Sequence, residues 1–400
     1  MPAITESSQA ARANGGTAEQ IRERNLSSIL GWLHRDGALS RADLTRLSGL
    51  GRSTVGVVLA ELAELGLIVE RPAVARGAGR PSPIFESDPS IVAIAVNPEV
   101  DALHIGLIGM NGQVRRRARI AYEDGPPPVP QFVQSVNAVV AGMLAGGEWR
   151  VAGVGVAVPG QVRVSDGFVR EATHLGWTDQ PVGERLHGAL GYPVHAANAA
   201  VLALRAESTF GAGRGIDDLF YIIGGASGIG GGAVSDGRLV FGTNGHAGEV
   251  GHVFVGDTDR RCTCGSTGCF ETAVSRAELF AALGMSDSEE DELDERAATT
   301  DRPEALALME KYRATLRHVL QSVVNLFNPS TVIIGGFLAV ITEGREAKDL
   351  VGEAIRSARE GTTVLRGSSH PDLLLVGAAE LVFAELIADP AGQAPAALIA

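Results

Sequence analysis

The sequence lacks several features that define large classes of protein. No run of 18 apolar residues occurs in its 400 residues, so we expect no membrane-spanning segment. Residues 1–17 contain no apolar core, which excludes a secretory signal. Aromatic residues make up only 5% of the chain, and only three residues are cysteine. The cysteines are placed for metal binding rather than for pairing, which fits the reducing cytoplasm.

The remaining composition is that of a globular protein, with 45% hydrophobic and 20% charged residues. A chain of 400 residues exceeds a single core, so two or three domains are expected. The 51 glycines, together with few aromatics, indicate many tight turns between strands and helices, as in α/β proteins.

Acidic residues outnumber basic ones, and the net charge of −13 argues against general affinity for nucleic acids. The imbalance is uneven, however. Residues 1–82 hold ten Lys and Arg against eight Asp and Glu, whereas the rest of the chain holds 24 against 39. A mildly basic head on an acidic body is compatible with a DNA-binding head that has its own contact face.

All three cysteines lie within eight positions, at Cys262, Cys264 and Cys269, and His252 precedes them by ten residues. Three thiols and one imidazole form a complete tetrahedral set for zinc. Because no coordination position is left for water, the predicted zinc ion is structural and not catalytic. The alternative is a group of buried cysteines beside an unrelated surface histidine.

The N-terminal part reads as a polar, disordered tail followed by three helices. Apolar periodicity and end signals predict helices over residues 19–34, 40–47 and from Ser53 to Gly66. Ser40 and Asp43 form a capping box at the start of the second helix. Short strands are expected at 67–70 and 84–86 on either side of a loop. This order predicts a winged helix-turn-helix domain over residues 18–88, after a disordered tail at 1–17.

The third helix would begin with Arg52, Ser53 and Thr54, at the end that reaches base edges and phosphates in the major groove. The loop between the strands carries Arg76 and Arg80, flanked by glycine and proline. Such slim, extended arginines suit a narrow minor groove. The alternative is a protein-interaction head with a basic surface loop.

From residue 91 onward the pattern changes to strands. Strand-like runs at 91–96, 102–108 and 114–121 are joined by turns that include Asn111-Gly112. A glycine run at 224–232 follows another strand, and could hold an anion or simply form a tight turn. The chain closes with a predicted strand at 373–376 and a helix at 378–388. Strands, hairpins and crossover helices in this order predict two α/β lobes.

Several motifs at fixed spacings run through this body. They are Gly228-Ile-Gly-Gly-Gly, Gly242, the run GHAGEVGH at 245–252, the cysteine loop ending at Glu271, Pro159-Gly160, FGAGRG at 210–215 and NPSTVIIGG at 328–336. Together they resemble the ROK family, which groups sugar-responsive repressors with sugar kinases.

The resemblance implies a two-lobed, actin-like (ribonuclease-H-like) sugar kinase fold of α/β class. Lobe 1 would span residues 89–200, with 375–390 returning to it, and lobe 2 would span 201–374 with the zinc loop. In the family a sugar binds between the lobes, and the matching positions here are Glu249, His252 and Glu271, with Gly160 and His195 as further expected contacts. His252 could give one ring nitrogen to zinc and aim the other at a sugar hydroxyl. The alternative for the two glutamates is an ordinary ion pair or helix-end carboxylate.

Two departures from the family kinases stand out. Their Asn-Asp-Ala-Asn motif, in which the aspartate is the general base, reads His195-Ala196-Ala197-Asn198 here, and alanine accepts no proton. Their first phosphate loop, Asp-x-Gly-x-Thr, reads Val96-Asn97-Pro98-Glu99-Val100. We therefore expect no kinase activity.

The leading hypothesis is a cytoplasmic DNA-binding transcriptional regulator, most simply a repressor of carbohydrate uptake or catabolism genes. Its expected partners are a double-stranded DNA operator, a small sugar or phosphosugar effector, and a second copy of the chain in a homodimer or homotetramer. Two alternatives remain: an ATP-dependent sugar kinase with a DNA-binding head, and a scaffold whose body only dimerises.

Overall fold

The computed structural model describes residues 17–72, 83–256, 259–352, 354–368 and 370–395. The chain divides into two compact units. The head unit consists of the chain up to Asp88 together with Leu386–Ala394, and the body unit consists mainly of Pro89–Glu385. In the described part of the chain, none of the helices combines the length and the apolar character needed to cross a membrane.

The head unit contains three helices and a small antiparallel sheet. The helices are α1 (Ala18–Asp36), α2 (Arg41–Ser48) and α3 (Arg52–Glu64), and the strands are β1 (Leu39–Ser40), β2 (Ile68–Arg71) and β3 (Ile84–Ser87), in the order β1-β3-β2. The three predicted helices are thus confirmed. The Ser40 side chain caps α2 by accepting the backbone N–H of Asp43 at 3.1 Å, and Gly49 ends it with a left-handed φ of 68°.

The core of the head unit is formed by apolar residues at helical spacing. Leu26, Ile29, Leu30 and Leu33 of α1 are fully buried, as are Leu44 of α2 and Val55 and Leu62 of α3. The predicted loop between β2 and β3, with Arg76 and Arg80, lies outside the described residues.

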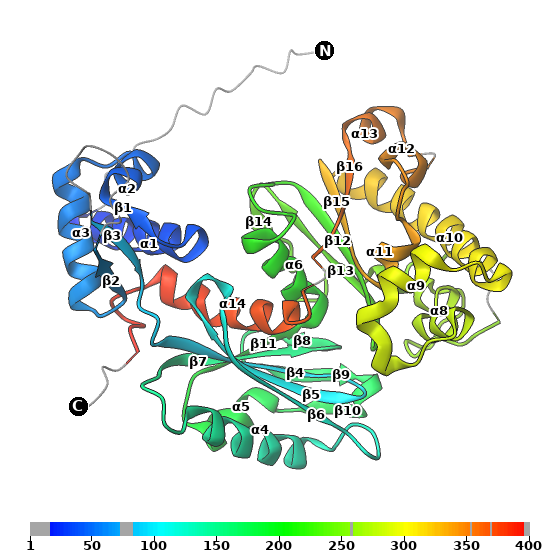
Figure 1. Cartoon of the computed structure of the whole chain (residues 1–400), viewed down its shortest axis with the longest axis horizontal. Coiled ribbons are helices and arrows are strands. Elements are labelled where there is room, and N and C mark those ends of the chain that lie inside the picture. Colours follow the sequence, from blue (N-terminus) through cyan, green and yellow to red (C-terminus); the bar gives the residue numbers. More distant parts are fainter. Residues whose placement is uncertain (1–16, 73–82, 257–258, 353, 369, 396–400) are drawn as a thin grey trace. The chain divides into compact units, whose positions relative to one another are not determined.

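Lobe 1 of the body unit is built on a five-stranded sheet in the order β11-β7-β4-β5-β6. Its strands are β4 (Ile91–Pro98), β5 (Ala102–Gly109), β6 (Val114–Ala121), β7 (Arg150–Val158) and β11 (Val194–Asn198). Helices α4 (Val129–Leu144) and α5 (Val182–Leu190) cover one face, and α14 (Leu373–Ala388) covers the other (Figure 1). With both faces covered, β4 is buried along its whole length.

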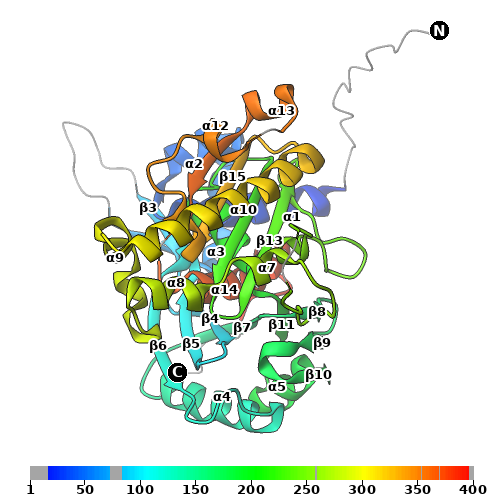
Figure 2. The same ribbon diagram turned by 90° about the vertical axis from the view of Figure 1, so that its right-hand side faces the viewer.

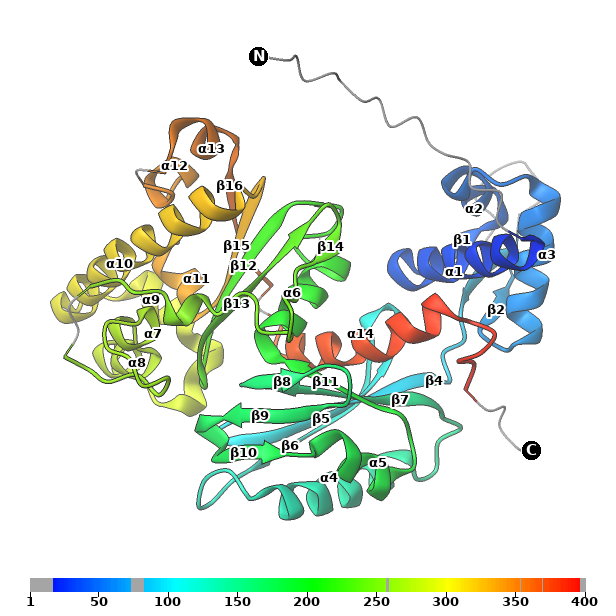
Figure 3. The same cartoon turned by 180° about the vertical axis from the view of Figure 1, so that it is seen from behind.

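The edge strand β6 shows how the sequence pattern fits this position. Its residues alternate strictly between half-buried and exposed, and arginines occupy three of the four exposed positions. Long charged side chains at a sheet edge oppose pairing with another chain. A second, three-stranded sheet of β8 (Gln161–Arg163), β9 (Phe168–Ala172) and β10 (Trp177–Gln180) extends lobe 1 (Figure 3).

Lobe 2 repeats the topology of lobe 1, with the order β14-β13-β12-β15-β16. Its strands are β12 (Leu219–Gly225), β13 (Gly228–Ser235), β14 (Arg238–Leu239), β15 (Thr331–Gly336) and β16 (Thr363–Arg366). In both sheets three sequential strands pair antiparallel, and two later strands add in parallel beside the first. Helix α6 (Ala199–Phe210) connects β11 of lobe 1 to β12 of lobe 2.

The helices of lobe 2 cover its sheet from the side seen in Figure 2, with the long helix α10 (Pro303–Phe327) in front. The shorter helices are α7 (Phe270–Ala273), α8 (Arg276–Leu283), α9 (Leu293–Thr299), α11 (Phe337–Ile341), α12 (Ala347–Leu350) and α13 (Arg356–Gly361). Buried residues of α10, among them Tyr312, Leu316 and Leu320, join Phe220 and Val332 of the strands in one apolar core.

One predicted element is wrong. Residues 373–376 do not form a strand but the first turn of α14. This helix is apolar on nearly all sides because it is buried between the sheet of lobe 1 and α6. Glycines allow this close packing: a Cβ at Gly155 would lie 1.9 Å from the carbonyl oxygen of Ala378, and a Cβ at Gly377 would lie 2.1 Å from that of Leu202. A helix with no polar face shows no 3.6-residue period in its sequence.

Candidate functional site

A cavity of about 150 Å³ opens between the two lobes of the body unit. Lobe 1 contributes Glu99 after β4, residues 159–161 after β7, and the segment 171–174. Lobe 2 contributes the glycine turn between β12 and β13, the 3₁₀ helix Val250–His252 and part of the cysteine loop. Glu99 follows β4, residues 159–160 follow β7, and the glycine turn joins β12 to β13, so part of the cavity forms where strand ends of the two lobes meet.

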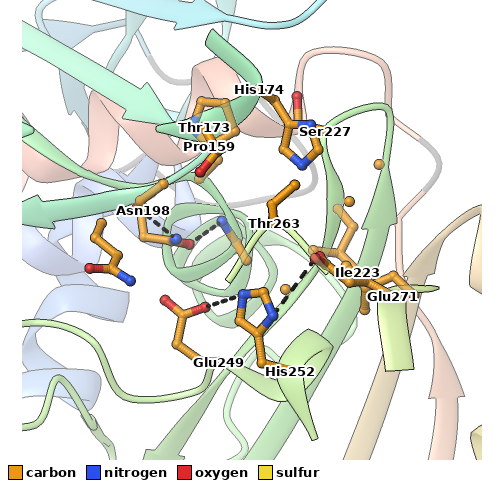
Figure 4. Close-up of a pocket in the computed structure, with 18 of the residues that line it drawn as sticks. Pro159, Thr173, His174, Asn198, Ile223, Ser227, Glu249, His252, Thr263 and Glu271 are labelled. Atoms are coloured by element: carbon orange, nitrogen blue, oxygen red, sulfur yellow. Dashed lines mark hydrogen bonds and ion pairs between the residues drawn. The ribbon is translucent and has the colours of Figure 1, made fainter. Parts of the chain in front are cut away.

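Glu249 and His252 line the cavity because the segment that carries them lies directly against β13. A Cβ at Gly251 would stand 2.1 Å from the carbonyl oxygen of Ile229, and one at Gly248 would stand 2.6 Å from that of Gly231. Both positions therefore require glycine. Nε2 of His252 lies 3.8 Å from Oε2 of Glu249 (Figure 4). Burial raises the pKa of Glu249, opposed by the nearby histidines.

The structure brings together all four predicted metal ligands, His252, Cys262, Cys264 and Cys269, with their ligand atoms within 4.8 Å of one another. Sγ of Cys264 lies 3.6 Å from Sγ of Cys269, and Nδ1 of His252 lies 3.5 Å from Sγ of Cys262. A tetrahedral ion with bonds of about 2.3 Å to sulfur and about 2.05 Å to nitrogen separates its ligands by about 3.8 and 3.5 Å respectively. The four side chains therefore fit a metal ion.

The thiols differ in their surroundings. Burial, with the Glu271 carboxyl beside it, raises the pKa of Cys262 to about 12, and the Cys262 thiol donates to Oε1 of Glu271 at 2.9 Å. Hydrogen bonding, first from the backbone of Ser266, lowers the pKa of Cys264 to about 7. A buried thiol beside a carboxylate needs a cation to become a thiolate ligand.

Asn198 holds the predicted contact Gly160 at the cavity. Its side chain caps α6 by accepting the backbone N–H of Ala200 at 2.8 Å, and its amide donates to the carbonyl oxygen of Gly160 at 3.0 Å. Gly160 fits here because a Cβ would lie 2.3 Å from the carbonyl oxygen of Glu171. The end of β11 and the turn after β7 are thus fixed together.

Glu99 bridges the two lobes, a contact that the sequence did not predict. Its carboxylate accepts a hydrogen bond from the hydroxyl of Ser227, which stands in the glycine turn between β12 and β13. Burial raises the pKa of Glu99, opposed by hydrogen bonds from Ser227 and Asn97 and assisted by Asp101 and Glu290. The position that matches the first phosphate loop of family kinases is therefore filled by a carboxylate.

The wall opposite Glu249 and His252 carries Thr173 and His174 (Figure 4). Glu171 also lines the cavity, and the sequence analysis predicted none of these three residues. Thr173 donates its hydroxyl to Oε1 of Glu171 at 3.2 Å. No motif in the sequence marks these residues, and the burial pattern around them, with exposed pairs at 170–171 and 173–174, does not alternate regularly.

His195 does not line the cavity among the described residues, and its expected role as a ligand contact is corrected here. It pairs with Gly155 in the parallel ladder, and that face of the sheet packs against α14. Burial lowers the pKa of His195, opposed by Glu385 of α14. Ala196 points to the other face, fully buried in the apolar core under α4 and α5.

In the head unit, Arg52, Ser53 and Thr54 form the first turn of α3, where Arg52 and Ser53 are exposed. Gly51 precedes them as the N-cap, with no side chain to satisfy the first N–H groups of the helix. Arg76 and Arg80 belong to residues 73–82, outside the described part of the chain.

Comparisons with known proteins agree with this architecture. The family model described as "ROK family" matches residues 93–384. A xylose repressor of Caldicellulosiruptor bescii is 26% identical over 347 residues, covering 80% of this chain and 84% of that protein. A glucokinase of Halalkalibacterium halodurans is 32% identical over 201 residues, covering 46% of this chain and 61% of that protein. The crystal structure of a ROK family transcriptional regulator, a homolog of the Escherichia coli MLC protein, superimposes with a TM-score of 0.73 at 22% identity, covering 94% of this chain and 99% of that one.

Proposed function

The chain belongs to the ROK family, and we propose that it is a DNA-binding transcriptional repressor whose affinity for its operator is controlled by a sugar bound between the lobes. The relative from Caldicellulosiruptor bescii is a xylose repressor, and it is similar over most of both chains. Control of carbohydrate uptake or catabolism genes is the corresponding role for this chain.

The cavity has the chemistry that a sugar requires. Glu249 and Glu271 offer carboxylates, which accept hydrogen bonds from sugar hydroxyls, often two at once. The ring of His252 lies between them, with Nε2 3.8 Å from Glu249 and Nδ1 3.7 Å from Glu271. We propose these three residues, with the backbone at Gly160, as the sugar contacts.

One observation carries the proposal of a sensor rather than an enzyme. The position of the general base in family kinases is Ala196, whose methyl group is buried in the core of lobe 1. Loss of a positioned base costs about 10² to 10⁴ in rate. Glu99 in addition occupies the first phosphate loop position, so two positions that serve catalysis in family kinases are altered here.

We propose that the metal is zinc and that it is structural. Three thiols and one imidazole fill a tetrahedral zinc shell and leave no site for water. When bound, the ion would supply an electrostatic anchor for the loop and no Lewis-acid chemistry. His252 is one of the proposed metal ligands, and Glu271 lies beside the metal cluster. Both residues also line the cavity, so the bound metal would hold the sugar-binding wall in place.

We propose that the head unit is a winged helix-turn-helix domain that binds duplex DNA. Its order of three helices and a β-hairpin suits this fold, and α3 would enter the major groove with Arg52, Ser53 and Thr54 at its leading end. Arg76 and Arg80 would contact the minor groove. The head would then offer both major-groove and minor-groove contacts.

Regulation would require two heads, because a palindromic operator presents half-sites about one helical turn apart. A homodimer is the smallest assembly that supplies them, and a homotetramer would also do so. A sugar that binds one arrangement of the lobes more tightly than another would shift the spacing of the heads and thereby the DNA affinity. Such a protein acts on the chromosome in the cytoplasm.

The test is a DNA-binding titration. Duplexes selected by the purified protein from a random-sequence library serve as the operator, and affinity is measured by fluorescence anisotropy with and without each member of a sugar panel. At least one sugar should weaken binding, and the effect should disappear in Glu249→Ala and Glu271→Ala. If DNA affinity stays constant with every sugar, or both variants respond as the unmodified protein does, the body is only a scaffold and the proposal fails.

The alternative of a sugar kinase with an attached head is favoured by the glucokinase relative and by the retained glycine turns at 224–228 and 335–336. A coupled ADP-release assay over hexoses, pentoses and amino sugars tests it. Turnover that is abolished by Glu249→Ala would establish the kinase and overturn the sensor.

A further inference from the structure

The cavity carries a strongly one-sided charge. Four carboxylates line it, those of Glu99, Glu171, Glu249 and Glu271, and no lysine or arginine is found among its described lining residues. The histidines of the cavity are His174 and His252. A sugar phosphate brings about −1.5 to −2 charges at that pH. Proteins bind phosphate mainly through arginine, lysine or free backbone N–H groups, and the first two are missing here.

The backbone route to an anion is also closed. The glycine turn between β12 and β13 is the part of the cavity where backbone N–H groups could hold a phosphate. Glu99 reaches this turn from lobe 1 and accepts the Ser227 hydroxyl. Glu271 reaches it from lobe 2, since its Oε2 lies 2.9 Å from the position that a Cβ would take on Gly228. Two carboxylates thus flank the one turn suited to an anion.

A metal ion in the cysteine cluster would not reverse this sign. A divalent cation bound by three thiolates and a neutral imidazole has a formal charge of −1. The cluster adjoins the cavity through Cys264 and His252. The metal-loaded cluster, with its net negative charge, would therefore add to the negative charge of the cavity instead of opposing it. With or without the ion, the described lining residues of the cavity therefore include no lysine or arginine to balance the carboxylates.

We propose that the cavity binds unphosphorylated carbohydrate, neutral or carrying an amine, and rejects sugar phosphates, with Glu99 as the residue that sets this selectivity. The inference rests on the proposed function as a sugar sensor and narrows its effector. Hydroxyl groups donate to carboxylates without electrostatic cost, and an ammonium group is attracted, whereas a phosphate ester meets four carboxyl groups and no lysine or arginine among the described lining residues.

The test uses matched pairs of each sugar with its phosphate ester, including glucose, N-acetylglucosamine and xylose, measured by isothermal titration calorimetry on the full-length protein. We expect a free sugar to bind and its ester to bind at least about tenfold more weakly. An ester that binds as tightly as its parent sugar would overturn the inference while the sensor function stands. Absence of binding in both series would overturn the inference and the sensor function together.

The variant Glu99→Gln separates charge from shape, because glutamine is nearly isosteric and can still accept the Ser227 hydroxyl. In Glu99→Gln the gap between the affinity for the free sugar and the affinity for its ester should narrow by about tenfold. Glu184→Gln, at an exposed position of α5, is the matched control and should leave the gap unchanged. A gap that persists in full in Glu99→Gln would show that Glu99 does not set the selectivity.

Discussion

Nδ1 of His252 lies 3.5 Å from the thiol of Cys262, while Nε2 of the same ring faces Glu249 in the cavity. One imidazole thus belongs to both the metal cluster and the proposed sugar site. Orienting a ring through one nitrogen fixes which nitrogen is free to act on a ligand. The first prediction follows from this shared residue.

Cys264→Ser should lose the metal and loosen the cavity wall, because metal binding and local folding are coupled. Metal analysis of protein purified without chelator should find about one zinc per chain in the unmodified protein and little in the variant. Sugar affinity should fall as well, since His252 and Glu271 lose their anchor. Thr267→Ser, in the same loop, is the control and should retain both metal and affinity. Unmodified protein that contains no zinc would count against the site.

The sequence predicted the grouping of the four candidate metal ligands and the three helices of the head unit, for physical reasons that are local. The caps at Ser40 and Gly49, the period of Leu26, Ile29 and Leu33, and the spacing of three cysteines are all properties of a few neighbouring residues. Each such signal survives without knowledge of the rest of the fold.

What the sequence did not predict depends on distant contacts. The direction of His195 follows from the packing of α14 on the sheet, and the helical start of α14 at Leu373 follows from its burial on nearly all sides. The Glu99–Ser227 bridge joins residues 128 positions apart. Glu171 and His174 reach the cavity only because the small sheet folds over lobe 1. No periodicity or motif encodes such long-range contacts.

The second prediction concerns the head. Arg52→Ala should weaken DNA binding to all sequences and lower the salt dependence of binding by about one counterion, because Arg52 stands exposed at the first turn of α3. Anisotropy titrations at several salt concentrations measure the slope. Arg185→Ala, at an exposed position of α5 in the body unit, removes the same charge and should leave the slope unchanged. Equal slopes for Arg52→Ala and the unmodified protein would remove Arg52 from the DNA contacts.

The third prediction concerns Glu207, the most deeply buried carboxylate of the body unit that the structure describes, with 0% exposure. Its Oε2 accepts the backbone N–H of Ala212 at 2.8 Å, and its Oε1 accepts that of Ser368. The two carboxylate oxygens thus join the end of α6 to the segment between β16 and α14. Both α6 and this segment connect one lobe to the other.

Glu207→Ala leaves two partly buried N–H groups without their acceptor, at about 1–3 kcal/mol each when they are desolvated, so we expect a loss of about 2–5 kcal/mol in the free energy of unfolding. Urea unfolding of the full-length protein, analysed at the transition of the body unit, measures this change in free energy. The exposed control Glu184→Ala should stay within about 0.5 kcal/mol. Equal midpoints for the two variants would show that Glu207 does not link the connections.

The last prediction is a pH dependence that originates at His195. Burial against α14 lowers the pKa of His195 below its value of about 6.5 in the unfolded chain. As the pH falls through that unfolded value, the unfolded state takes up a proton that the folded state resists, so stability present at neutral pH is lost on acidification. His104, whose pKa burial also lowers, acts in the same direction, while Glu99 and Glu249, with raised pKa values, act in the opposite one.

The contribution of His195 to the pH dependence of stability is isolated by comparing variants, because several groups contribute to the profile of the unmodified protein. His195→Gln cannot take up the proton, so between about pH 7.5 and pH 5.5 it should lose less stability than the unmodified protein does. Urea unfolding at both pH values gives the two differences. His318→Gln, at an exposed position of α10, should give a profile parallel to that of the unmodified protein. If His195→Gln is also parallel, the histidine is not held neutral by burial, and the packing of its side chain against α14 must differ from that described.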